Sequence, residues 1–184
     1  EYDFSWNGRY YVYGYGKFQG SRTQLESAIT LAYDTYGTVV DSNSKLVWKR
    51  YRSTQASIDG IVPVTSGDSI VNAVVAVSNY LGADFNAVSY MEQGHTAVET
   101  FDNIRGVHGI SLTGITYEKA LSYVGDGSPV IARIGEDEYI IITAYNSSEI
   151  AYIEASTGAQ KTASMNEAGK MFSQGGNIYV TYYK

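Results

Sequence analysis

The chain has 184 residues, of which 44% are hydrophobic and 17% charged, a composition typical of an ordered globular protein. Its formal net charge is −6 and its 13 Lys and Arg residues are scattered, which argues against nucleic acid as a partner. There is no Cys, so disulfides and a thiol nucleophile are excluded. With His95 and His108 as the two histidines, we expect no metal site and no cofactor. No apolar run approaches the roughly 18 residues that span a bilayer, so we expect no membrane insertion within this chain.

Residues 1–52 predict a small N-terminal module with the order β-α-β-β. Residues 10–15 are rich in side chains that favour a strand, and a loop follows. Ser21, with Gln three residues later, is typical of a helix start, and the apolar residues after it recur at helical spacing until Gly37. Short β-runs within residues 38–48 predict a hairpin. We expect this module to cover one side of a larger domain.

A polar stretch at residues 51–60 is the predicted linker, and a short strand is expected at residues 61–64. The next segment, residues 67–82, has apolar side chains at helical spacing and ends at a glycine. Most of these side chains are β-branched, which lowers their intrinsic helix propensity. A helix at this place must be stabilised by burial. We therefore expect it to be the central, buried helix of a domain that spans residues 61–184.

Residues 83–109 carry a weak pattern, which predicts short helical pieces and loops. Thr116 precedes a row of apolar residues at helical spacing and is expected to cap a helix. Ser164 and Glu167 form a capping-box pattern before another short helix. Strands are predicted at residues 129–134, 139–145, 149–155 and 178–183. Helices followed by antiparallel strands indicate the α+β class.

Two stretches of the chain carry a family resemblance. Residues 127–132 match the G-x-P-V-I-A strand of C39-like cysteine peptidases from Gram-positive bacteria, and residues 109–184 resemble the C-terminal half of that family. Residues 67–82, which end in Asn-Tyr-Leu-Gly, are similar to the family's nucleophile helix. The resemblance covers roughly residues 61–184. It implies a papain-like fold, in which a central buried helix packs on an antiparallel sheet, and a secreted or cell-surface location.

The nucleophile region departs from the pattern of the family, whose helix begins with Cys. Counting back from Asn79 places the nucleophile position on Ser69, or on Asp68 if the register differs by one residue. The oxyanion-stabilising Gln that the family carries just before its nucleophile is missing from residues 63–66. Loss of one oxyanion donor usually lowers turnover by about 10²- to 10³-fold. The resemblance therefore implies a weakened site even before the base is considered.

The histidine and aspartate positions differ from the family as well. The strand that begins with the catalytic His in the family begins here with Glu138, just before Tyr139. The Asp of the family's Asp-Pro corner is matched by Glu154, with Ala155 in place of the proline. A Glu side chain has an ordinary pKa of about 4.3 and is a poor general base for a hydroxyl at neutral pH. The resemblance thus implies a degenerate catalytic triad.

We expect this chain to be a catalytically inactive, C39-like domain that acts as an extracytoplasmic binding module for a peptide or protein segment. A cell-wall glycan is the second candidate ligand. Two other interpretations stay open: a hydrolase that uses Ser69, Glu138 and Glu154, and a structural spacer within a larger surface protein. The expected ligand cleft contains Asp68, Ser69, Glu138, Tyr139 and Glu154.

The alignment with the family also predicts a geometry. Ser69 should lie at the N-terminus of the buried helix, where free backbone N–H groups favour negative charge. Glu138 should lie within several Å of Ser69, and Glu154 should approach Glu138 from the neighbouring strand. Two carboxylates at such a distance should raise the pKa of at least one of them, unless the helix terminus or a cation compensates.

Overall fold

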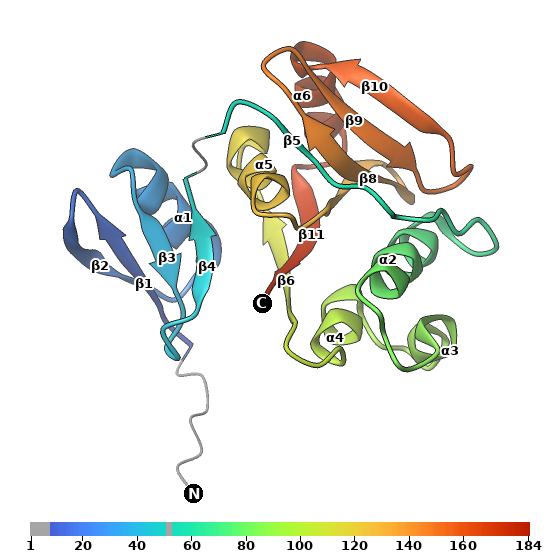
Figure 1. Cartoon of the computed structure of the whole chain (residues 1–184), viewed down its shortest axis with the longest axis horizontal. Coiled ribbons are helices and arrows are strands. Elements are labelled where there is room, and N and C mark those ends of the chain that lie inside the picture. Colours follow the sequence, from blue (N-terminus) through green and yellow to red (C-terminus); the bar gives the residue numbers. More distant parts are fainter. Residues whose placement is uncertain (1–7, 51–52) are drawn as a thin grey trace, which may run out of the picture.

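The computed structural model describes residues 8–50 and 53–184 and contains two antiparallel sheets. Figure 1 shows a smaller sheet with one helix at the left and a larger sheet with several helices at the right. The predicted α+β class is confirmed. Within the described residues, no helix combines the length and the apolar character needed to cross a bilayer.

The N-terminal module is a four-stranded sheet with the order β2-β1-β3-β4, covered by one helix. Its elements are β1 (Tyr10–Gly14), β2 (Lys17–Arg22), α1 (Leu25–Asp34), β3 (Thr38–Val40) and β4 (Leu46–Lys49). The predicted order β-α-β-β lacks one strand, because the sequence pattern predicts a loop where β2 lies. Its side chains are all exposed or half-buried, so it lacks the apolar alternation that marks a strand.

The start of α1 also differs from the prediction. Ser21 lies in β2, and the N-cap is Gln24, whose side chain makes no capping hydrogen bond. The chain reverses between β1 and β2 at Tyr15 and Gly16, which both have positive φ angles of 50° and 74°. This two-residue turn with left-handed backbone at both positions is the type that matches the twist of a hairpin. The hairpin therefore takes the residues that the capping pattern assigned to the helix start.

The larger sheet runs in the order β10-β9-β8-β7-β11-β6, and every neighbouring pair in it is antiparallel. A short strand, β5, pairs with the end of β8. The strands are β5 (Ala56–Ser57), β6 (His108–Thr113), β7 (Val130–Gly135), β8 (Glu138–Tyr145), β9 (Glu149–Glu154), β10 (Gln160–Ser164) and β11 (Ile178–Tyr183). All four strands predicted in this part of the chain are present. Three of them are neighbours in the sheet as β7, β8 and β9, and the fourth is β11.

Several predictions for this domain need correction. The predicted linker is not a free connection, because residues 56–57 join the larger sheet as β5; residues 51–52 lie outside the described residues. Residues 61–64 do not form the predicted strand. The strands β6 and β10 were not predicted. β10 has the sequence QKTAS and is an edge strand with mostly exposed side chains, so it carries no apolar signal.

The helices of this domain are α2 (Ser69–Tyr80), α3 (Ala87–Glu92), α4 (Ala97–Asp102), α5 (Tyr117–Gly125) and α6 (Met165–Gln174). Four of them pack on the strands, whereas α3 packs on α2 and α4. The central helix α2 buries a continuous run of residues from Asn72 to Ser78 and packs on β8, as its β-branched sequence predicts. The capping box of Ser164 and Glu167 is present at the start of α6. Thr116 occupies the N-cap of α5 without a side-chain capping bond.

The N-terminal module is fastened to the domain by buried and hydrogen-bonded contacts. Trp48 on β4 is 1% exposed, and its indole Nε1–H donates to the backbone carbonyl of Lys119 on α5 at 2.9 Å. The hydroxyl of Tyr183 on β11 donates to Asp41 Oδ2 at 2.9 Å. These contacts hold β4 beside the ends of α5 and β11, so the two parts of the chain share one interface.

Candidate functional site

Ser69 is the first residue of α2, and Asp68 is the N-cap. Ser69 is 8% exposed, and its side chain faces the backbone of β8. The backbone N–H of Tyr139 donates to Ser69 Oγ at 2.8 Å, and Ser69 Oγ–H donates in turn to the carbonyl oxygen of Tyr139 at 3.3 Å. A hydroxyl has one proton to donate, and here that proton is directed to a peptide carbonyl. The Ser69 hydroxyl thus joins the start of the central helix to the start of β8.

A second side chain of α2, which the sequence analysis missed, strengthens the same junction. Asn72 is 1% exposed; its Oδ1 accepts from the backbone N–H of Gly67 at 2.8 Å, and its Nδ2 donates to the carbonyl of Ala155 at 3.0 Å. The N–H of Ala155 in turn donates to Tyr139 O at 3.1 Å. The signal in the sequence is an amide within an otherwise apolar helix, because a buried amide needs partners. Asn72 therefore ties α2 to the corner that follows β9.

Glu138 is the first residue of β8 and directly precedes Tyr139, whose backbone N–H donates to Ser69. The backbone of Glu138 therefore lies beside the start of α2, while its side chain is exposed. Asp68, which directly precedes Ser69, is exposed as well. Within residues 8–50 and 53–184, neither carboxylate belongs to an ion pair. Two uncompensated acidic side chains thus flank the contact between Ser69 and Tyr139.

Glu154 ends β9 and makes other contacts than the predicted ones. Lys161 Nζ lies 2.6 Å from Glu154 Oε2, and Thr157 Oγ1 donates to Glu154 Oε1 at 2.9 Å. The hydrogen bond from Lys161, followed by that from Thr157, lowers the pKa of Glu154 below its ordinary value. We expected the pKa of at least one of the carboxylates of Glu138 and Glu154 to be raised. For Glu154 the opposite holds, because its pKa is lowered by Lys161. The reason is β10, which was not predicted and which brings Lys161 next to β9.

The lowered pKa of Glu154 predicts a pH-dependent contribution to stability. Because its folded-state pKa is depressed, the stabilisation is present above the unfolded-state pKa and is lost as pH falls through the folded-state pKa. Glu154→Gln should lower the free energy of unfolding at pH 7 by at most about 1 kcal/mol, since the pair is partly solvated. Urea unfolding of both proteins between pH 7 and pH 3 measures the difference, which should shrink as the pH falls.

Glu149→Gln is the matched control, because Glu149 begins the same strand with an exposed side chain and no ion pair within the described part of the chain. It should change stability equally little at both pH values. A loss for Glu154→Gln that persists unchanged at pH 3 would contradict the assignment of the pKa shift to the Lys161 contact.

The two histidines lie on other elements than the start of α2 and β8. His95 stacks on Tyr90 with ring centroids 3.8 Å apart, and its Nδ1 lies 3.3 Å from Glu99 Oε2. His108 opens β6 and stacks on Tyr183 at 4.9 Å. No group of three or more His, Asp or Glu side chains in the described ranges is placed to hold a metal ion. Both imidazoles thus take part in aromatic contacts away from Ser69.

Comparison with known proteins supports the fold. No family model and no curated protein sequence matches this chain. A crystal structure described as that of a C39-like peptidase from Bacillus anthracis is similar, with a TM-score of 0.58 and 10% sequence identity, over 72% of this chain and 98% of that chain. Likeness at so low an identity concerns the architecture and not the chemistry. The chain therefore has a fold similar to that of a C39-like peptidase.

Proposed function

We propose that this chain is a catalytically inactive, C39-like domain that binds a peptide segment outside the cytoplasm. The observation that carries the proposal is the Ser69 hydroxyl, which is buried and hydrogen-bonded in both directions to the backbone of Tyr139. Acyl transfer needs a nucleophile whose proton is taken by a nearby base. Here the proton of Ser69 is directed to a carbonyl oxygen, which cannot serve as that base.

The competing interpretation as a hydrolase with Ser69, Glu138 and Glu154 is less well supported. Glu154 is held by Lys161 and Thr157, so its carboxylate is engaged by β10 and the turn before it. Glu138 has an exposed side chain rather than one enclosed beside the hydroxyl. A base that is solvated and one that is paired with a lysine do not form the relay that a serine nucleophile requires.

The charge around Ser69 indicates which peptides would bind best. Asp68 and Glu138, which directly precede Ser69 and Tyr139 in the chain, are exposed next to their contact, and the turn before β8 adds Glu136 and Asp137. Opposite charges on a ligand increase the association rate and the specificity of such a face. The proposed ligand is therefore an extended segment that carries Lys or Arg. The proposed extracytoplasmic location rests on the resemblance of residues 61–184 to C39-like domains of the cell surface, together with the many Tyr residues and the lack of Cys in the sequence.

One incubation tests both parts of this proposal. A Lys- and Arg-rich peptide with a fluorescent label should bind, remain uncleaved at pH 7, and dissociate as NaCl is raised from about 50 to 500 mM. The double variant Asp68→Asn, Glu138→Gln should bind it about tenfold more weakly, because two exposed attractive charges are lost. Fluorescence anisotropy measures the affinity, and mass spectrometry of the same sample detects cleavage.

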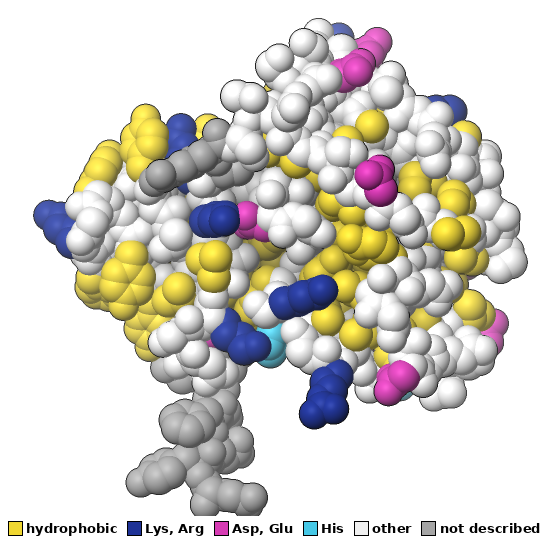
Figure 2. Space-filling view, viewed as in Figure 1, with side chains coloured by type: hydrophobic (Ala, Val, Ile, Leu, Met, Phe, Trp, Pro, Cys, Tyr) yellow, Lys and Arg dark blue, Asp and Glu magenta, His cyan; other side chains and the backbone are white. Residues whose placement is uncertain are grey.

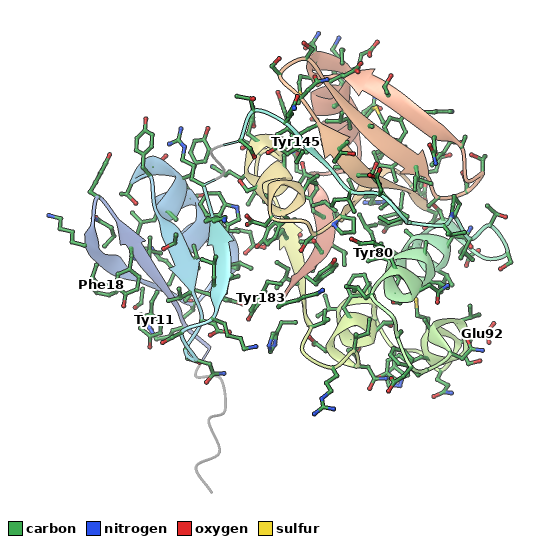
Figure 3. The ribbon with its side chains drawn as sticks, viewed as in Figure 1. Tyr11, Phe18, Tyr80, Glu92, Tyr145 and Tyr183 are labelled. Carbon is green, nitrogen blue, oxygen red and sulfur yellow. The ribbon has the colours of Figure 1, made fainter. Side chains whose placement is uncertain are left out.

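Glu92→Gln is the control for charge, because Glu92 is exposed at the end of α3, away from β8 (Figure 3). Ser69→Ala is the control for catalysis. Cleavage of the peptide that Ser69→Ala abolishes would refute the inactive domain. Equal affinity of the double variant and the Glu92→Gln protein would refute the peptide site at Ser69.

A further inference from the structure

A cleft of about 690 Å³ lies where the N-terminal module meets the larger domain. The turn after α1 and the end of β4 line it from the module, and the end of α5 lines it from the domain. Figure 2 shows basic and acidic side chains meeting between these two parts of the chain. Clefts of about 300–1,000 Å³ are the usual size of small-molecule sites. The volume therefore admits a small organic molecule or the end of a peptide.

Arg50, which directly follows β4, lines this cleft and is held by two tyrosine rings. Its guanidinium carbon lies 4.2 Å from the centre of the Tyr33 ring and 4.0 Å from that of Tyr36. One of its terminal N–H groups donates to the carbonyl oxygen of Tyr33 at 2.8 Å. Within residues 8–50 and 53–184, Nε and Nη2 of Arg50 donate to no other group. Rings that pack on a guanidinium leave the N–H groups along its edge for a further partner.

Tyr36 is held in a backbone conformation that side chains disfavour. Its φ is 54°, in the left-handed region, at the position after a helix where glycine is usual. The residue is 68% exposed, so burial of the ring does not offset the strain. The ring contacts Arg50 and Tyr15. Strain of this kind is typically retained where it positions a functional group. Tyr36 is therefore assigned as a positioning residue for Arg50.

The charges that line the cleft leave one cation without a counterion. Lys49 Nζ lies 3.2 Å from Asp126 Oδ1, and this contact opposes the rise in the pKa of Asp126 that burial causes. Arg50 is half-buried and belongs to no ion pair in the described part of the chain. The described lining residues thus carry two positive charges against one negative charge, a surplus of one positive charge. Charges withdrawn from water are normally compensated by an opposite charge.

A surplus of one positive charge suits a carboxylate better than a phosphate. A carboxylate carries one negative charge, and its two oxygens accept side by side from the edge of a guanidinium. A phosphate monoester carries about 1.5 to 2 negative charges at pH 7, so part of its charge would lie uncompensated near Asp126. An uncharged ligand would leave Arg50 without a counterion. The cleft therefore favours a ligand with a single carboxylate.

We propose that this cleft is a binding site for a monocarboxylate, whose two oxygens accept from Nε and Nη2 of Arg50. The terminal carboxylate of a peptide and the carboxylate of a small organic acid share this chemistry, and the volume of the cleft admits both. Ser69, Asp68 and Glu138 do not line the cleft. The two proposed sites are thus independent, and either can exist without the other.

Nuclear magnetic resonance titrations of the 15N-labelled protein test this proposal. The Nε–H signal of Arg50 is identified by its loss in Arg50→Lys. N-acetyl-tetraalanine with a free carboxylate, or propionate, should shift this signal with a dissociation constant below about 10 mM. N-acetyl-tetraalanine amide should not shift it, and inorganic phosphate should bind more weakly than the carboxylates. Tighter binding of the peptide acid than of propionate identifies a peptide end as the ligand. Equal binding identifies a small organic acid.

Arg50→Lys should weaken carboxylate binding at least tenfold, because it keeps the charge but removes the planar pair of donors. The affinity is followed at the backbone N–H signals of Gly37 and Gly125, which line the cleft. Arg105→Lys is the matched control, since Arg105 is exposed between α4 and β6 and does not line the cleft. It should bind as the unmodified protein does.

Tyr36→Asn tests the positioning role, because Asn tolerates a left-handed backbone and removes the ring. It should weaken carboxylate binding about threefold or more, without a lower melting temperature in the absence of ligand. The proposal is wrong if neither carboxylate shifts the Arg50 signal, if the amide or phosphate binds as tightly as the acids, or if Arg50→Lys and Arg105→Lys bind equally well. Unchanged affinity of Tyr36→Asn would overturn the role of Tyr36.

Discussion

Trp48→Ala should lower the free energy of unfolding by about 3–5 kcal/mol, the usual loss when a large aromatic side chain is removed from a core. Trp48 is 1% exposed and its ring centroid lies 6.5 Å from that of Tyr33. Its indole N–H also donates to Lys119 O on α5. The substitution therefore leaves a cavity between the module and the domain and removes the hydrogen bond that joins them at this place. Urea unfolding followed by circular dichroism measures the loss.

Trp48→Phe separates the two contributions, because it keeps most of the apolar surface and removes only the donor. The expected loss is roughly 1–2 kcal/mol, which corresponds to one hydrogen bond and a small void. Limited proteolysis of the Trp48→Ala protein should cut between the module and the domain, whose contacts depend on this side chain. A loss below about 1 kcal/mol for Trp48→Ala would show that the module does not depend on this contact.

Gly175→Ala should lower the free energy of unfolding by at least about 3 kcal/mol or prevent folding. Gly175 is the C-cap of α6, where the chain passes close to β7. A Cβ atom at this residue would lie 1.9 Å from the carbonyl oxygen of Arg133 and 2.4 Å from its carbonyl carbon. Both are backbone atoms of a paired strand, so they cannot turn away as a flexible side chain could. The strand β7 would have to shift.

Gly176→Ala is the matched control one residue later. Gly176 has a φ of +85°, and the nearest atom to an added Cβ is the flexible end of Ile178 at 3.6 Å. Its cost is the strain of a left-handed alanine, about 1–2 kcal/mol. Thermal unfolding of the two variants should rank Gly176→Ala above Gly175→Ala in stability. The reverse order would show that α6 and β7 are less closely packed than the structure indicates.

The sequence by itself determined the elements whose signals are local. The β-branched run before Asn79 predicts a buried helix, and the structure contains α2 at this place. The capping box of Ser164 and Glu167 is present at the start of α6. These patterns depend on contacts between residues that are near in the chain. They are therefore visible before the fold is known.

The strands β2, β6 and β10 were decided by tertiary structure. β2 and β10 are edge strands with largely exposed side chains, so their sequences carry no apolar period. β6 alternates buried and exposed residues only from Ile110 onward, and it follows a stretch whose pattern is weak. Such strands form because a neighbouring strand offers its free backbone groups. That condition is set by the rest of the sheet.

The candidate site divides in the same way. The family resemblance placed Ser69 beside the start of β8 through motif spacing, and the structure puts these residues in contact. The direction of the Ser69 proton towards Tyr139 O and the capture of Glu154 by Lys161 depend on how β8, β9 and β10 pair. Only packing between residues distant in sequence decides whether a polar group finds a partner.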